Sequence, residues 1–159
     1  MTTQSTAAPV RTQIVVEAPV QRAFDVFTQD MASWWPADHH ILEGELAEMV
    51  FEPRVGGRIY DRNMHGGECM WARVLAYEPP QRLVFSWDIT PQWQIETDPD
   101  RTSEVEVRFV AETASRTRVE LEHRALERHG EGWEGTHGAV SSEGGWPKTL
   151  AAFAAHAAA

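Results

Sequence analysis

Two consecutive segments alternate apolar and polar residues with a period of two, and this pattern constrains the fold more than any other feature. In "SEVEVRFVAE" (residues 103–112), Val107 and its apolar neighbours face one side, and the charged residues between them face the other. "RVELEHRAL" (residues 118–126) repeats the pattern around Leu121, and "ASRT" supplies a turn between the two. Such alternation is typical of antiparallel strands with one covered face and one solvated face. The segments therefore predict two neighbouring strands whose inner face needs a cover.

Shorter segments predict the elements that precede these strands. "RTQIVVE" (residues 11–17) is rich in β-branched residues and indicates a strand. "PVQRAFDVFTQD" gathers its apolar residues on one helical face, with Pro19 at the first position, and a second short helix is expected over residues 31–35. In "FEPRVGGRIY" (residues 51–60), a proline and two glycines separate two strands and indicate a hairpin turn. The predicted order is one strand, two helices, about six strands and a long C-terminal helix.

For the strand predicted in "ECMWARVLAY" (residues 68–77), the sequence does not decide which of the two faces points inward. If Trp71 points inward, Cys69 and Leu75 do so as well, and Glu68 is solvated. If Ala72 and its neighbours point inward instead, Glu68 enters the interior, where its pKa would be raised.

The last apolar segment, "WPKTLAAFAAH", has helical spacing and is the element expected to cover the sheet. Pro147 fits the first turn of a helix or kinks one that begins earlier, near Ala139. The chain is therefore predicted to be an α+β protein with a curved antiparallel sheet wrapped around a long C-terminal helix.

Size and charge limit the function. A chain of 159 residues suits one domain, predicted at residues 11–158 after a disordered lead at residues 1–10. The net charge of −10 opposes binding to nucleic acid, and no segment is long and apolar enough to span a membrane. The single cysteine excludes an intrachain disulfide. A cytoplasmic location without a cofactor is expected.

Histidines are the polar residues with the greatest chemical interest. His123 falls on the inner face, where an imidazole could bind a ligand or act as a base, or simply be satisfied within the core. His39 and His40 are adjacent, so in an extended segment they point apart, and no metal-binding spacing is present. They are expected at the mouth of a cavity or in solvent. No metal site and no catalytic residue is assigned.

Four segments in order resemble one known family. They are "FEPRVGGRIYDR", "WARVLAYEPPQRLVFSW", "VEVRFVAETASRTRVELEHRALERHG" and "GGWPKTLAAFA". They are similar to the C-terminal-domain family of activators of the heat shock protein 90 ATPase, which belongs to the helix-grip superfamily of START-like, birch-pollen-allergen-like proteins. The resemblance covers roughly residues 12 to 156.

The resemblance implies a ligand cavity between the sheet and the last helix. The seven tryptophans and other aromatic residues would line it or would be plain core. The predicted function is binding of a hydrophobic or aromatic small molecule, with polarity from His123 or Tyr60. The predicted contacts are Trp35, Met49, Phe51, Tyr60, Trp71, Phe85, Trp87, Phe109, His123, Trp146 and Phe153.

The superfamily leaves two other functions open, because fold does not decide function. One is a cyclase-type or hydrolase-type enzyme that uses the same cavity. The other is a co-chaperone-like module that stimulates a heat shock protein 90 ATPase, although the N-terminal chaperone-binding domain of eukaryotic members is not expected here. A chaperone partner and a homodimer are therefore alternatives that the sequence leaves undecided.

Overall fold

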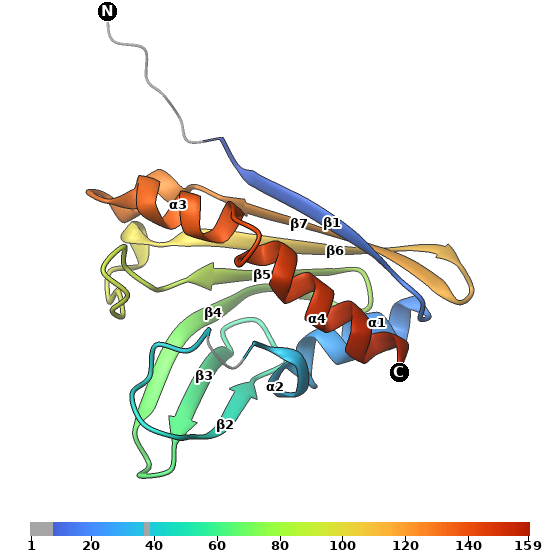
Figure 1. Ribbon diagram of the computed structural model, residues 1–159, viewed down its shortest axis with the longest axis horizontal. Coiled ribbons are helices and arrows are strands. Elements are labelled where there is room, and N and C mark those ends of the chain that lie inside the picture. The colour runs from blue at the N-terminus through green and yellow to red at the C-terminus, as the bar shows by residue number, and fades with distance from the viewer. Residues whose placement is uncertain (1–7, 37–38) are drawn as a thin grey trace, which may run out of the picture.

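The computed structural model describes residues 8–36 and 39–159, so residues 1–7 of the predicted lead lie outside it. Seven strands form one antiparallel sheet in the order β1-β7-β6-β5-β4-β3-β2. The sheet curves strongly, with β2, β3 and β4 turning away from the other strands (Figure 1). The strands are β1 Val10–Val16, β2 Leu46–Phe51, β3 Arg58–Asn63, β4 Glu68–Glu78, β5 Arg82–Trp87, β6 Ser103–Thr113 and β7 Arg116–Arg124.

The helices lie on the inner, concave face of the sheet (Figure 1). They are α1 Val20–Thr28, α2 Met31–Trp34, α3 Trp133–Ser141 and α4 Trp146–Ala158, with short 3-10 turns at Pro99–Arg101 and Leu126–His129. α4 packs against β1, α1 and α2. Arg22 on α1 contacts the C-terminal end of α4, where its Nε donates to the carbonyl oxygen of Ala157 at 2.7 Å. The predicted α+β fold, a curved antiparallel sheet that grips a C-terminal helix, is confirmed.

The alternating segments form β6 and β7 as predicted. Val107 lies opposite Leu121 in the register, and both side chains are buried. The outer face carries ion pairs, and its buried Glu106 binds Arg82 and Arg124. Burial alone would raise the pKa of Glu106, but the hydrogen bonds from these arginines outweigh it and lower the pKa to about 2. The wet face is therefore held together by charge and the inner face by apolar packing.

A β-bulge in β4 determines which of its residues point inward. The register against β3 shifts at Trp71, so the alternation of β4 changes phase there. Trp71 and Ala72 are consequently both buried, while Glu68 is exposed and Leu75 is 37% exposed. The prediction that Leu75 accompanies Trp71 inward is wrong, and so is the alternative that places Glu68 in the interior.

α3 and α4 are separate helices, joined through Gly144 and Gly145. A Cβ atom at Gly145 would lie 2.3 Å from the carbonyl oxygen of Val140, so only glycine permits this close approach. Pro147 occupies the first turn of α4, which settles the alternative left open by the sequence.

Aromatic rings fill the space beneath the C-terminal half of α4. Phe153 on α4 contacts Phe27 on α1 with ring centroids 5.1 Å apart, and Phe27 contacts Phe109 on β6 at 5.6 Å. Phe27 and Phe153 are fully buried and Phe109 is nearly so. This part of the helix therefore packs directly onto the core.

Candidate functional site: a tryptophan-lined pocket

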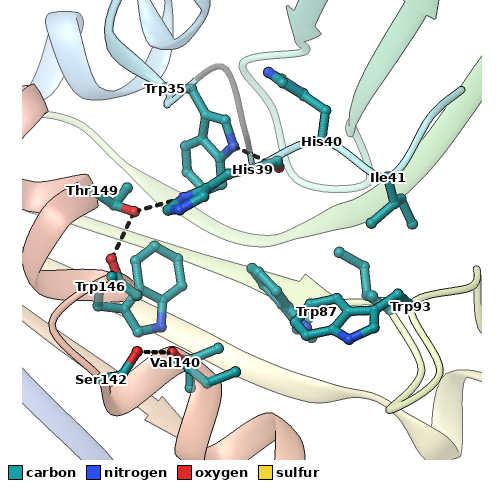
Figure 2. Close-up of a pocket in the computed structure, with 14 residues that line it drawn as sticks. Trp35, His39, His40, Ile41, Trp87, Trp93, Val140, Ser142, Trp146 and Thr149 are labelled. Carbon is teal, nitrogen blue, oxygen red and sulfur yellow. Dashed lines mark hydrogen bonds between the residues drawn. The ribbon is translucent and has the colours of Figure 1, made fainter. Parts of the chain in front are cut away.

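A pocket of about 620 Å³ opens where α4 begins. Its walls come from the segment after α2, the end of β5 with the loop that follows it, the end of α3 and the first turn of α4. Figure 2 shows indole rings on both sides of the opening. Among the side chains that line it are Trp35, His39, Trp87, Trp93, Trp146 and Thr149.

Four tryptophans form a closed ring of contacts at the inner end of this pocket. Trp35 contacts Trp71 and Trp146, with centroid distances of 5.2 and 6.0 Å. Trp87 completes the ring, at 5.9 Å from Trp71 and 5.7 Å from Trp146. Most of these pairs are edge-to-face, the arrangement that aromatic quadrupoles favour. Each indole is thus packed against two others of the ring.

Few polar groups reach this wall. Thr149 on α4 donates to the carbonyl oxygen of Gly145 at 3.1 Å and lies 3.3 Å from Nδ1 of His39. The side chain of His39 points toward Thr149, whereas that of His40 turns away from the tryptophans (Figure 2). His40 instead bonds the buried carboxylate of Asp61 on β3, with 2.7 Å between Nδ1 and Oδ2. The pair anchors the pocket rim to the sheet.

A chain of buried hydrogen bonds lies behind the tryptophans. Trp146 donates from Nε1 to Nδ1 of His123 at 3.1 Å. Nε2 of His123 is 2.7 Å from the hydroxyl of Ser103, which is also 2.7 Å from Nε2 of His129. Burial, with smaller contributions from His129 and a further histidine, lowers the pKa of His123 to about 3, and burial lowers that of His129 as well. Both imidazoles are therefore neutral at physiological pH.

Three of the eleven predicted ligand contacts line the pocket, namely Trp35, Trp87 and Trp146. The others lie elsewhere. Trp71 and His123 are buried in contact with the wall tryptophans. The packed core contains Phe85, Phe109 and Phe153. Met49 and Phe51 are on β2, and Tyr60 lies on the opposite face of β3 from the buried Asp61. Their assignment as ligand contacts stays a prediction.

The sequence did not single out three other parts of the pocket. Trp93 lies in a loop without periodicity, and Gly144 and Gly145 lie just before the apolar pattern of α4 begins. Ser142 lies at the end of α3, a helix whose glycine-rich segment carries no clear apolar face. The only signal for Trp93 was its residue type, since the sequence made all seven tryptophans candidates to line a cavity.

Metal binding and membrane insertion receive no support from the described residues. Within residues 8–36 and 39–159, no group of three or more histidine, cysteine, aspartate or glutamate side chains could hold a metal ion. No helix in the same ranges is long and apolar enough to cross a membrane.

Known proteins share both the sequence and the shape of this chain. An anthrahydroquino-gamma-pyrone synthase, Txn09, is 44% identical over 94% of this chain and 97% of its own, with a TM-score of 0.67. CalC, a self-sacrificing resistance protein from Micromonospora echinospora, is 27% identical over 94% and 93%, with a TM-score of 0.65. Protein NE0264 from Nitrosomonas europaea, at 14% identity over 94% and 93%, shares the fold, with a TM-score of 0.63.

The family comparison agrees with the resemblance found in the sequence. Among curated proteins none matches this chain. The family model described as "Activator of Hsp90 ATPase homolog 1-like protein" matches residues 17–158. The chain therefore belongs to the family of Activator of Hsp90 ATPase homolog 1-like proteins, within the helix-grip fold.

Proposed function

We propose that this chain binds a flat, polycyclic aromatic molecule in the pocket at the start of α4. The observation that carries the proposal is the ring of four indoles, of which Trp35, Trp87 and Trp146 line a volume of about 620 Å³. Pockets of roughly 300–1,000 Å³ with apolar walls and few polar groups are typical small-molecule sites. Rigid aromatic walls favour a rigid aromatic ligand, because neither partner loses much conformational entropy on binding.

The pocket also supplies polar groups that could orient such a ligand. Thr149 and His39 meet at one side of it. A ligand with carbonyl or phenol oxygens suits these groups better than a hydrocarbon chain does.

A second candidate function is ring closure of the bound molecule, which the 44% identity to a synthase favours. Formation of a γ-pyrone from a phenol and a diketone joins the phenol oxygen to a carbonyl carbon and then releases water. His39, His40 and Thr149 line the pocket and are able to move the protons for this step. The 27% identity to a resistance protein instead suits capture without turnover. A chaperone partner, a homodimer and a cytoplasmic location stay predictions from the sequence.

Binding can be tested with defined aromatic probes. Tryptophan fluorescence and calorimetry would follow titration with dihydroxyanthraquinone and with xanthone, a dibenzo-γ-pyrone, and lauryl alcohol would serve as a flexible apolar comparison. We expect saturable one-to-one binding of the aromatic probes and weaker binding of the alcohol. A preference for the alcohol, or no saturable binding of either aromatic probe, would overturn the proposal.

A matched pair of variants places the site. Ser142 is exposed and lines the pocket, so Ser142→Trp should obstruct it and weaken probe binding about tenfold or more. Ser141, its exposed neighbour, bonds the carbonyl oxygen of His137, and Ser141→Trp should leave binding unchanged. Equal effects of the two variants would place the ligand elsewhere.

Turnover needs a separate assay. A hydroxydibenzoylmethane is an open-chain phenol diketone that loses water to form a flavone. Formation of flavone above the rate in buffer, reduced in His39→Ala, would support ring closure. If the protein binds the aromatic probes but does not accelerate flavone formation, the function is binding without turnover.

A further inference from the structure

Among the large residues of the pocket, Trp93 has an exposure and a backbone conformation that packing of the fold does not account for. Its side chain is 48% exposed, although tryptophan is usually among the more buried residues. Its backbone φ is +61°, in the left-handed region that glycine and asparagine occupy readily and bulky residues avoid. A conformation of this kind persists only where the surrounding structure enforces it.

The surrounding turn does enforce it. Trp93 donates its backbone N–H to the carbonyl oxygen of Thr90 at 2.8 Å. The hydroxyl of Thr90 accepts from the backbone N–H groups of Gln92 at 3.2 Å and Gln94 at 3.1 Å. Below the turn, Ile89 pairs with Ile95 as an isolated antiparallel bridge. Thr90 therefore holds a small closed loop whose protruding residue is Trp93.

This loop presents the indole to the pocket. Trp93 and Ile89 both line the pocket, as does Trp87 at the end of β5. In the view of Figure 2, Trp93 and Trp87 lie on one side of the opening and Trp35 and Trp146 on the other. Unlike the wall tryptophans, Trp93 is exposed enough to change position without breaking a core contact.

We infer that Trp93 stacks on the aromatic face of the bound molecule and closes the pocket on its solvent side. The inference rests on the proposed function, and it adds the residue that selects for a flat aromatic ligand. The exposure of the Trp93 side chain and the strain of its backbone both oppose stability. A role in covering the ligand would explain why a tryptophan is nevertheless present at this position. An indole offers a large rigid surface for stacking, so removal of its ring should weaken binding strongly.

The test separates the ring of Trp93 from its backbone by using xanthone as the probe. Trp93→Phe keeps a ring and should bind within about threefold of wild type, whereas Trp93→Ala and Trp93→Gly should each bind about tenfold or more weakly. Both small variants lose the same ring, but glycine relieves the positive φ. Trp93→Gly should therefore melt about 2–4 °C above Trp93→Ala, the reverse of the usual order.

Ala125 provides a matched control, because its φ of +62° is nearly the same and it does not line the pocket. Ala125→Gly should raise the melting temperature and leave the affinity for xanthone unchanged. If wild type binds xanthone and Trp93→Ala binds within twofold of it, the inference fails while the proposed function stands. If Trp93→Gly melts below Trp93→Ala, the strain argument fails. If wild type binds neither xanthone nor dihydroxyanthraquinone, both the proposed function and the inference fail.

Discussion

The indole nitrogen of Trp146 donates to Nδ1 of His123 across 3.1 Å, and this single bond sets the protonation pattern behind the pocket. An indole N–H can only donate, so Nδ1 of His123 must accept, and the neutral ring carries its proton on Nε2. Nε2 of His123 therefore donates to the hydroxyl of Ser103, which also lies 2.7 Å from Nε2 of His129. The pocket wall is thereby connected to two buried histidines, and the tautomer of His123 is defined.

The tautomer of His123 is the first prediction. His123 should be the Nε2–H form, because its Nδ1 accepts from the indole of Trp146. Nitrogen-15 chemical shifts of the two imidazoles at pH 7 would show it. Observation of His123 as the Nδ1–H form would contradict the bond from Trp146.

Ser103→Ala should lower the free energy of unfolding by about 1–3 kcal/mol. The substitution leaves one ring nitrogen of His123 and one of His129 buried without a partner, and unpaired buried polar groups carry this cost. Urea denaturation would measure the loss. Ser141→Ala, which removes an exposed hydroxyl bonded to the carbonyl oxygen of His137, should change the value by less than about 0.5 kcal/mol.

The free energy of unfolding should decrease as the pH is lowered through the range in which histidines of the unfolded chain gain protons. The pKa of His123 is about 3 in the folded protein, below its ordinary value of 6.5, so unfolding takes up a proton between these values. Its contribution to stability is complete above pH 6.5 and is lost progressively as the pH falls from 6.5 toward 3.

Denaturation of wild type and His123→Phe at pH 7, 6 and 5 would test this. The variant should lose stability less steeply than wild type as the pH falls. His65→Gln, at an exposed turn, should keep the wild-type slope. Parallel pH profiles for wild type and His123→Phe would show that His123 is not held neutral.

Gly145→Ala should destabilise the protein by about 1–3 kcal/mol and weaken probe binding. The added Cβ would clash with the carbonyl oxygens of Val140 at 2.3 Å and Ala139 at 2.5 Å, which forces α3 and α4 apart at the pocket. Gly144→Ala is the control, since its Cβ would meet no atom within 4 Å. Equal stability of the two variants, measured by thermal melting, would argue against the close approach.

The thiol of Cys69 should be nearly inert in the native protein. Burial, with the nearby charge of Asp61, raises its pKa to about 11, so little thiolate forms at pH 8. Reaction with iodoacetamide should be slower than that of free cysteine by on the order of a hundredfold. Denatured protein should react at the ordinary rate. Fast labelling of the native protein would mean that β4 opens readily.

The element order and the sheet could be predicted because they depend on local patterns. The alternation around Val107 and Leu121 identifies β6 and β7 whatever their neighbours are, since a strand with one wet face requires that pattern. The turn at Gly56 needs a positive φ, of +84°, which is also a local requirement.

The phase of β4 could not be predicted for a physical reason. The bulge at Trp71 depends on pairing with β3, and no local signal in "ECMWARVLAY" marks the residue that is inserted. Periodicity alone offered two mutually exclusive faces, and the structure buries part of each.

The sequence by itself determined a helix-grip domain with an aromatic interior, because residue type and spacing act over short distances along the chain. Tertiary structure decided which aromatics fill the core and which enclose a space. Phe153 packs tightly against Phe27, whereas Trp146, two turns earlier on the same helix, borders the pocket. That difference arises from the break at Gly145 and from contacts with distant strands, which depend on the whole chain being folded.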